Sequence, residues 1–251
     1  MTSSSQFAVR AAIAPLLGES RISASLTSQL LSGETVTVTE QRADWLHVRG
    51  EDGYEGWTHA GYLAAATGHE SSWRVSLGCV VREGTGQPRA LPLGARLAPS
   101  AVIVDGDTMS PDQRDGRFPT NAAAIGTSAS SLFAGASYQW GGVTPWGCDC
   151  SGFVQRVFRL HGVGLPRDAW QQAGIGEELA RDAGAAHAAG DLLFFSDRDD
   201  ARVTHVGIAL GGGRMVHSSL TRGGIAVERM DGDDAYVARL RAGCTGVRRV
   251  I

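Results

Sequence analysis

Cysteine and histidine residues in the second half of the chain have the types and spacing that nucleophilic catalysis requires. Cys150 follows Asp149, an N-cap residue type, and Gly162 provides a stop signal for a helix between them. The apolar residues of this segment follow the i, i+3, i+4 spacing of an amphipathic helix, at Phe153, Val154, Val157 and Phe158. The positive end of a helix dipole stabilises an anion, so we expect a lowered pKa for the Cys150 thiol. Because the thiolate is the reactive form, Cys150 is the candidate nucleophile.

Two histidines further along the chain provide a candidate base and a group to orient it. Residues 204–210 and 214–218 read as two strands joined by a turn of three glycines. In the first strand, apolar residues alternate with His205 and small residues, which predicts one apolar face and one face carrying His205. With the turn centred near Gly212, His205 and His217 become diagonal neighbours, about 7 to 8 Å apart at the backbone. A nucleophile, a base and a polar orienting group form the arrangement of a catalytic triad.

Together with Tyr138, these residues resemble the NlpC-type cell-wall peptidases, a family of papain-like cysteine peptidases. The resemblance covers about the last half of the chain and lies in the order Tyr138, Asp149-Cys150-Ser151-Gly152-Phe153, His205-Val206-Gly207 and His217. It implies that Cys150 is the nucleophile, His205 the base and His217 the orienting residue. It also implies that the Tyr138 phenol and the backbone N–H of Cys150 stabilise the tetrahedral intermediate.

The resemblance further implies a substrate and the residues that hold it. The bond cleaved would join γ-D-glutamate to meso-diaminopimelate or lysine in peptidoglycan stem peptides, with no cofactor and no metal. In enzymes of this type that process free muropeptides, residues at the positions of Asp168, Ser151, Glu34 and Tyr54 would hold the free α-amine of the substrate. Asp168 also has a structural interpretation, because Asp168 and Gln171 have the spacing of a capping box. Glu34 and Tyr54 are alternatively a turn residue and a barrel-surface residue.

The first half of the chain has the pattern of small β modules. Alternating β-branched and aromatic residues predict strands at 35–39, 45–48 and 54–59, with a turn at Asp52-Gly53. This pattern resembles bacterial SH3 domains. Shorter strand-like segments at 73–75, 79–81, 91–95 and 102–104 predict a second, divergent SH3-like barrel. We therefore expect an α+β papain-like catalytic domain preceded by two small all-β SH3-like barrels, with domains at 1–65, 66–118 and 119–251.

Composition restricts the partners and the location. The chain has 251 residues, of which 43% are hydrophobic, and its net charge of -3 without a basic run argues against a nucleic-acid partner. No segment has the length and hydrophobicity of a membrane span. The uncharged residues 1–6 lack the basic region of a secretory leader, and the four cysteines show no disulfide-framework spacing. These features predict a cytoplasmic protein with reduced thiols, or a periplasmic or secreted one if a leader has been removed. The expected partners are peptidoglycan-derived peptides.

Several alternative functions stay open on the sequence. Cys148 and Cys150 with His205 and His217 could ligate zinc, although structural zinc sites usually have wider cysteine spacing. The chain could be an exported hydrolase of intact wall, or an amidase or acyltransferase on the same scaffold. A non-catalytic wall-binding protein is a further alternative, but it would not need Cys150, His205 and His217 together.

Overall fold

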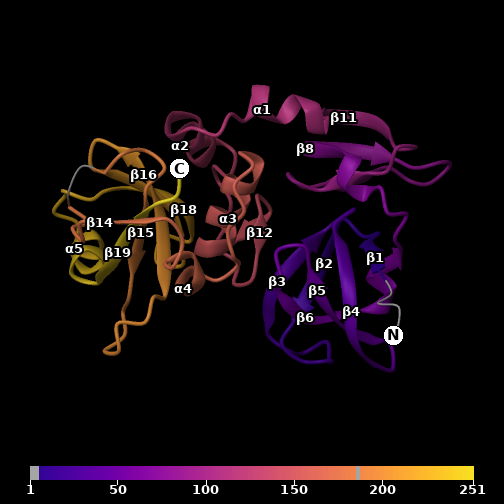
Figure 1. The fold of residues 1–251 in the computed structure, drawn as a ribbon, viewed down its shortest axis with the longest axis horizontal. Coiled ribbons are helices and arrows are strands. Elements are labelled where there is room, and N and C mark those ends of the chain that lie inside the picture. The colour runs from indigo at the N-terminus through magenta and orange to yellow at the C-terminus, as the bar shows by residue number, and fades with distance from the viewer. Residues whose placement is uncertain (1–5, 185–186) are drawn as a thin grey trace. The chain divides into compact units, whose positions relative to one another are not determined.

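The computed structural model describes residues 6–184 and 187–251, which form two compact units. The first unit runs to Arg114 and includes Trp140–Gly142, and the second comprises Asp115–Gln139 and Val143–Ile251. Figure 1 labels many of the elements of both units and colours the chain from indigo at the N-terminus to yellow at the C-terminus. Within the described ranges, no helix is long and apolar enough to cross a membrane.

The first unit contains a seven-stranded antiparallel sheet in the order β3-β2-β6-β5-β4-β1-β7. Its elements are β1 (Gln6–Val9), β2 (Ile13–Leu17), β3 (Leu26–Leu31), β4 (Thr35–Arg42), β5 (Trp45–Gly50), β6 (Glu55–His59), η1 (Ala60–Tyr62) and β7 (Leu63–Ala65). The three strands predicted between residues 35 and 59 are confirmed as β4, β5 and β6. Strand β2 was not predicted, because Pro15 within it disfavours a strand. The structure accommodates Pro15 because β2 pairs with β6 only at Leu17 and Trp57.

A smaller sheet follows in the same unit, with β10, β9 and β11 all paired to β8. The elements are η2 (Glu70–Ser72), β8 (Arg74–Arg82), β9 (Arg89–Leu91), β10 (Arg96–Leu97), β11 (Val102–Met109) and η3 (Pro111–Gln113). Helix α1 (Arg114–Arg117) begins at the last residue of this unit and continues into the second. Segments 73–75 and 79–81, predicted as separate strands, are largely one strand. A bulge in the pairing of β8 with β11 lets β8 continue as one strand. At this bulge Gly106 lies against Gly78, and a Cβ on residue 106 would collide with the Gly78 carbonyl. The assignment of 66–118 to a second SH3-like domain stays a prediction.

The second unit combines helices with a six-stranded antiparallel sheet in the order β14-β19-β15-β16-β17-β18. Its helices are α2 (Ala122–Ser131), α3 (Cys150–Leu160), α4 (Ala169–Gln172) and α5 (Ala235–Ala242). Its strands are β12 (Val143–Thr144), β13 (Gly147–Cys148), β14 (Glu177–Leu179), β15 (Leu192–Phe195), β16 (His205–Gly211), β17 (Arg214–Ser219), β18 (Gly224–Arg229) and β19 (Cys244–Arg249). The helix-then-sheet order predicted for the catalytic domain is therefore present.

Helix α3 is buried on nearly every side. It packs against β16 and β17, while α2, α4 and β12 contact its other sides. The predicted apolar stripe is confirmed, since its four residues have no exposed surface: Phe153, Val154, Val157 and Phe158. The amphipathic pattern did not predict that Gln155 and Arg156 are buried as well. Gln155 is accommodated because its Nε2 donates to the Leu165 carbonyl at 3.0 Å. This enclosure gives the start of α3 a well-defined position.

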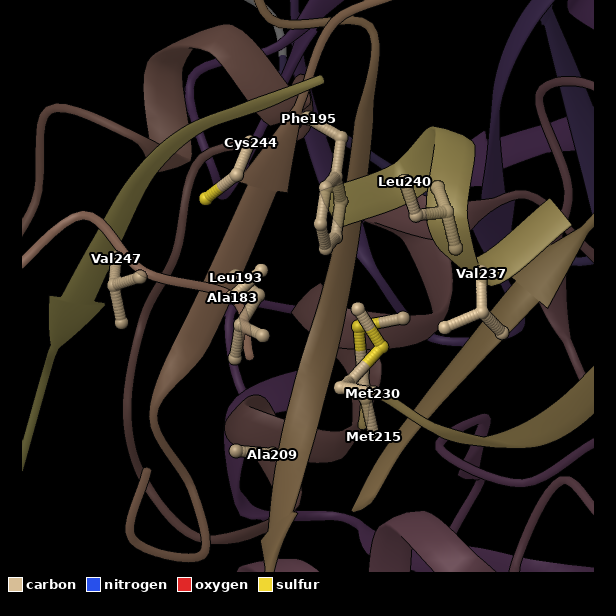
Figure 2. Close-up of a cluster of buried hydrophobic side chains, with 10 residues drawn as sticks. All are labelled: Ala183, Leu193, Phe195, Ala209, Met215, Met230, Val237, Leu240, Cys244 and Val247. Atoms are coloured by element: carbon tan, nitrogen blue, oxygen red, sulfur yellow. The ribbon is translucent and has the colours of Figure 1, made fainter. Parts of the chain in front are cut away.

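The face of the sheet that carries His205 is covered by a cluster of buried apolar side chains, shown in Figure 2. Leu193, Phe195 and Met215 of the sheet cluster there with Val237 and Leu240 of α5. The small residues predicted on this face therefore leave room for the apolar side chains packed against it. A Cβ at Gly207 would come within 2.4 Å of the Met215 sulfur, so only glycine leaves room for that side chain. Both faces of the sheet are consequently buried near the histidines.

Candidate active site

Cys150 is the first residue of α3 and is only 7% exposed. The Asp149 carboxylate caps the helix by accepting the Gly152 N–H at 2.7 Å, which confirms the predicted N-cap. The backbone groups of Val206 and Ser151 form hydrogen bonds with the thiol. Since Val206 directly follows His205, these contacts place the thiol at the start of β16, whose first residue is the candidate base.

Burial controls the ionisation of both groups. Burial, reinforced by the Asp149 charge, raises the pKa of the Cys150 thiol to about 12. Burial and the neighbouring His217 lower the pKa of His205 to about 3. The thiol pKa expected from the helix terminus is therefore wrong in direction, because desolvation outweighs the dipole. Each group is neutral at rest, and a thiolate arises only when the thiol proton passes to the imidazole.

The two histidines meet as the strand pattern predicted. Ile208 pairs with Val216 in the antiparallel hairpin of β16 and β17, a register that makes His205 and His217 diagonal neighbours. His205 Nε2 lies 2.7 Å from His217 Nδ1, a hydrogen-bond distance. Their ring centroids are 4.9 Å apart, and His217 is fully buried. His217 is therefore placed to orient the His205 ring.

Tyr138 lies alongside the strand that leads to Cys150. Its backbone forms a bridge with Cys148, and its N–H donates to the Gly223 carbonyl at 2.9 Å. Burial, followed by the charges of Cys150 and Asp149, raises the pKa of the Tyr138 phenol. The phenol therefore stays protonated and able to donate a hydrogen bond. Its role at the oxyanion stays a prediction.

A buried ion pair next to the thiol, between Arg167 and Asp149, was not predicted from the sequence. Arg167 donates to both carboxylate oxygens of Asp149, at 2.6 and 3.0 Å, and to the Ser151 hydroxyl at 2.9 Å. The side chains of Arg167 and Asp149 are only 1% and 8% exposed. Nothing in the local pattern links positions 149 and 167, because the loop after α3 brings them together. The pair holds the cap residue of the helix that presents Cys150.

The predicted substrate-binding residues fall into both units. Asp168 is half-buried and is the N-cap of α4, where the predicted capping box with Gln171 is confirmed. Glu34 and Tyr54 belong to the first unit. The turn interpretation of Glu34 is confirmed, because its Oε2 accepts the Leu31 N–H at 3.0 Å within a tight turn, where the residue is only 3% exposed. Tyr54 packs against the core of the first sheet. Amine binding by these residues and Ser151 stays a prediction.

Cys148 is buried and lies in β13, with its carbonyl accepting the Ser218 hydroxyl at 2.7 Å. Burial raises the pKa of its thiol to about 12. It forms no disulfide, and neither do Cys79, Cys150 and Cys244. Over residues 6–184 and 187–251, no group of three or more His, Cys, Asp or Glu side chains is placed to hold a metal ion.

The lowered pKa of His205 makes stability depend on pH. In the unfolded chain His205 has its ordinary pKa of 6.5 and binds a proton below that pH, whereas in the folded protein it stays neutral. The folded protein therefore loses stability as pH falls below 6.5. For one proton the loss approaches about 1.4 kcal/mol per pH unit. We expect His205→Asn to lose less stability than the parent protein between pH 7 and pH 5, measured by urea unfolding. His161, whose pKa burial also lowers, would leave a residual loss in both proteins. Parallel pH dependence in both would contradict a neutral His205.

Comparison with known proteins finds a family match in each unit. The profile of the NlpC/P60 family matches residues 135–241, and that of the bacterial dipeptidyl-peptidase Sh3 domain matches residues 16–60. The chain is 30% identical over 229 residues to the gamma-D-glutamyl-L-lysine dipeptidyl-peptidase of Bacillus subtilis, covering 78% of this chain and 73% of that protein. It is 40% identical over 98 residues to the murein DD-endopeptidase MepS/murein LD-carboxypeptidase of Escherichia coli K12, covering 39% of this chain and 49% of that protein.

A solved structure extends the likeness to the whole fold. An NlpC/P60 family protein from Bacillus cereus superposes with a TM-score of 0.80 at 20% identity, covering 98% of this chain and 99% of that one. It shows that both units recur together in one protein. With an SH3-like domain ahead of a papain-like one, the chain belongs to the NlpC/P60 family.

Proposed function

We propose that the protein is a cysteine peptidase that cleaves the γ-D-glutamyl–diamino acid bond of peptidoglycan stem peptides. The observation that carries the proposal is the arrangement at the start of α3. Cys150 lies there beside the backbone of Val206, and His205 is hydrogen-bonded to a buried His217 at 2.7 Å. This is the nucleophile, base and orienting group of covalent acyl transfer.

In the proposed reaction the His205 imidazole takes the thiol proton as the sulfur of Cys150 attacks the scissile carbonyl. The oxyanion accepts hydrogen bonds from the backbone N–H of Cys150 and from the protonated Tyr138 phenol. The His205 imidazolium then donates its proton to the leaving amine of the diamino acid, which leaves an acyl-enzyme. Water, deprotonated by His205, hydrolyses the thioester and restores the resting pair.

The extent of the similarities supports a dipeptidyl-peptidase over a murein endopeptidase. The likeness to the Bacillus subtilis gamma-D-glutamyl-L-lysine dipeptidyl-peptidase covers 78% of this chain, whereas that to the Escherichia coli murein endopeptidase covers 39%. A dipeptidyl-peptidase removes two residues from a free amino end, so its site must recognise an ammonium group. We therefore propose that the substrates are free stem peptides that begin with L-alanine.

Asp168 is the stronger of the two candidates for amine recognition in the second unit. Its side chain is half-buried, and a carboxylate in a partly desolvated position binds an ammonium ion well. The Ser151 hydroxyl, by contrast, is engaged by Arg167 at 2.9 Å and lies 3.4 Å from Asp149. Ser151 would therefore contribute by holding Arg167 and Asp149 in place more than by binding the ammonium through its own hydroxyl.

We expect the protein to cleave L-Ala-γ-D-Glu-meso-diaminopimelate and to cleave the N-acetylated peptide at least about tenfold more slowly. Acetylation removes the positive charge that Asp168 would bind, and a charge-assisted hydrogen bond contributes about 1.5 to 3 kcal/mol. The measurement is release of L-Ala-D-Glu and its acetylated form by mass spectrometry, with the lysine peptide run in parallel. Asp168→Asn should reduce the preference, since asparagine keeps the N-cap but lacks the charge.

Gln171→Ala serves as the matched control for Asp168→Asn. It removes the other half of the capping box but leaves the Asp168 charge, so the preference for the free amine should persist. Equal rates on free and acetylated peptides would instead favour a hydrolase of intact wall, with Asp168 acting as a helix cap alone. No cleavage of either peptide would exclude the proposed reaction.

A further inference from the structure

Glu228 extends the line of the two histidines across a third strand. In the pairing of β17 with β18, His217 lies opposite Ala226, and Glu228 lies opposite Met215. Glu228 is therefore the diagonal neighbour of His217 on the same face, just as His217 is the diagonal neighbour of His205. Although it is a carboxylate in a short strand, Glu228 is only 6% exposed. Nothing in the reaction described above uses it.

The outer nitrogen of His217 faces this carboxylate. His217 Nε2 lies 3.5 Å from Glu228 Oε1, within ion-pair range but outside hydrogen-bond geometry. Among the described residues, this buried nitrogen has no hydrogen-bond partner. Buried polar groups in native structures are nearly always hydrogen-bonded, and the Glu228 carboxylate is the acceptor that lies near this nitrogen. The 3.5 Å separation is one that a small side-chain movement converts into a hydrogen bond.

Other charged groups hold the Glu228 carboxylate in place. Arg222 donates to its two oxygens at 2.7 and 3.0 Å, and Asp234 pairs with Arg222 at 2.9 Å. Tyr236 completes the surroundings, with its ring 6.0 Å from that of His217 and 5.0 Å from the Arg222 guanidinium. The contact with His217 and then Arg222, opposed by burial, lowers the pKa of Glu228 to about 2. The group is therefore a carboxylate at any working pH, available only as an acceptor.

An acceptor at this place decides which nitrogen of each ring carries the proton. The contact between His205 Nε2 and His217 Nδ1 requires one donor and one acceptor. If His217 donated from Nδ1, its bare Nε2 would face the carboxylate, and His205 would hold its proton on Nδ1, unable to take another. If His205 donates from Nε2, His217 presents an Nε2–H to Glu228, and His205 Nδ1 keeps a lone pair. Only the second state allows His205 to act as a base.

We infer that Glu228 is a positioning residue, which holds His217 in the Nε2–H tautomer and thereby keeps His205 in its basic form. This role rests on the proposed function, because it matters only if His205 takes the thiol proton of Cys150. Glu228 also faces the positive charge that develops on the histidine pair when that proton is transferred. The line then runs from the thiol through His205 and His217 to Glu228.

The test is a double-mutant cycle with Glu228→Gln and His217→Asn. Glu228→Gln keeps the side-chain volume but removes the charge and offers an amide N–H, which favours the wrong tautomer. We expect kcat to fall about tenfold or more with KM within about twofold, as expected when a base has the wrong tautomer. Asparagine has no tautomers, so adding Glu228→Gln to His217→Asn should change kcat less than about twofold. Equal effects of Glu228→Gln in both backgrounds would overturn the inference.

A second measurement does not depend on the substrate. The alkylation rate of Cys150 by iodoacetamide, followed from pH 5 to 9 by peptide mass spectrometry, reports formation of the thiolate with His205 as proton acceptor. Glu228→Gln should slow this reaction below pH 8, and His205→Ala should slow it further. If no stem peptide is cleaved but alkylation still depends on Glu228, the proposed function fails and the inference stands. An unchanged alkylation profile in Glu228→Gln would overturn it.

Asp191→Asn is the matched control for a purely structural effect. Asp191 is also a buried carboxylate of the second unit that accepts two bonds from an arginine, with Arg249 at 2.8 Å from each oxygen. It has no histidine beside it among the described contacts. Asp191→Asn should lower stability but leave the pH profile of Cys150 alkylation unchanged. A shift of that profile equal to that of Glu228→Gln would show that loss of any buried carboxylate suffices, against the inference.

Discussion

Cys150→Ser is expected to abolish turnover, by about ten-thousand-fold or more, without unfolding the protein. The hydroxyl is a much weaker nucleophile than the thiolate, and removal of the nucleophile of a catalytic triad has effects of this size or larger. Serine is nearly isosteric with cysteine, so the first turn of α3 and its Asp149 cap should persist. The measurement is the rate of L-Ala-D-Glu release from L-Ala-γ-D-Glu-meso-diaminopimelate, with circular dichroism as a check on folding.

Cys148→Ser is the matched control for this experiment. Cys148 is buried two residues before Cys150, and its backbone carbonyl accepts the Ser218 hydroxyl, a contact that any side chain leaves in place. This variant should keep most of the activity, within about threefold, because a buried Cys-to-Ser change costs stability more than geometry. An inactive Cys148→Ser with an active Cys150→Ser would reverse the assignment of the nucleophile.

Arg167→Met should destabilise the second unit by about 3 to 5 kcal/mol. The substitution removes the guanidinium that neutralises the Asp149 carboxylate in a place where both side chains are almost completely buried. Methionine retains the length and the apolar contacts of the arginine stem, so the loss reports the charge and not a cavity. Urea unfolding, followed by hydrogen exchange of peptides from α3, measures the change. The same variant should also lose activity, because the cap of the helix that bears Cys150 is disturbed.

Arg198→Met provides the comparison for Arg167→Met. Arg198 forms a similar bidentate pair with Asp200, at 2.9 Å, but both side chains are 54% exposed. Water solvates the remaining charge there, so the expected loss of stability is much smaller than for Arg167→Met. Equal losses in the two variants would mean that burial does not set the strength of these pairs, and would contradict the argument for Arg167.

The elements that carry the candidate chemistry could be predicted from the sequence because their signals are local. Asp149, four apolar residues at helical spacing and Gly162 define α3, and the structure confirms both its cap and its apolar stripe. The period of two along β16 and β17, with glycines between, was enough to make His205 and His217 diagonal neighbours. The same counting could have reached Glu228, since β18 follows β17 after a short turn. The residue types alone pointed to a thiol, a base and an orienting group.

Tertiary structure decided what depends on burial and on contacts distant in sequence. The position of Cys150 at the helix N-terminus predicted a lowered thiol pKa. Because other elements enclose α3, desolvation of the thiol outweighs the helix dipole, and the pKa of Cys150 is raised. Arg167 reaches Asp149 only because of the path of the chain after α3. The strand pattern placed His205 and small residues on one face, and only the structure shows that Met215 and α5 cover that face. Periodicity shows which side of an element a residue occupies, but the dielectric surroundings and the partners on that side come from segments elsewhere in the chain.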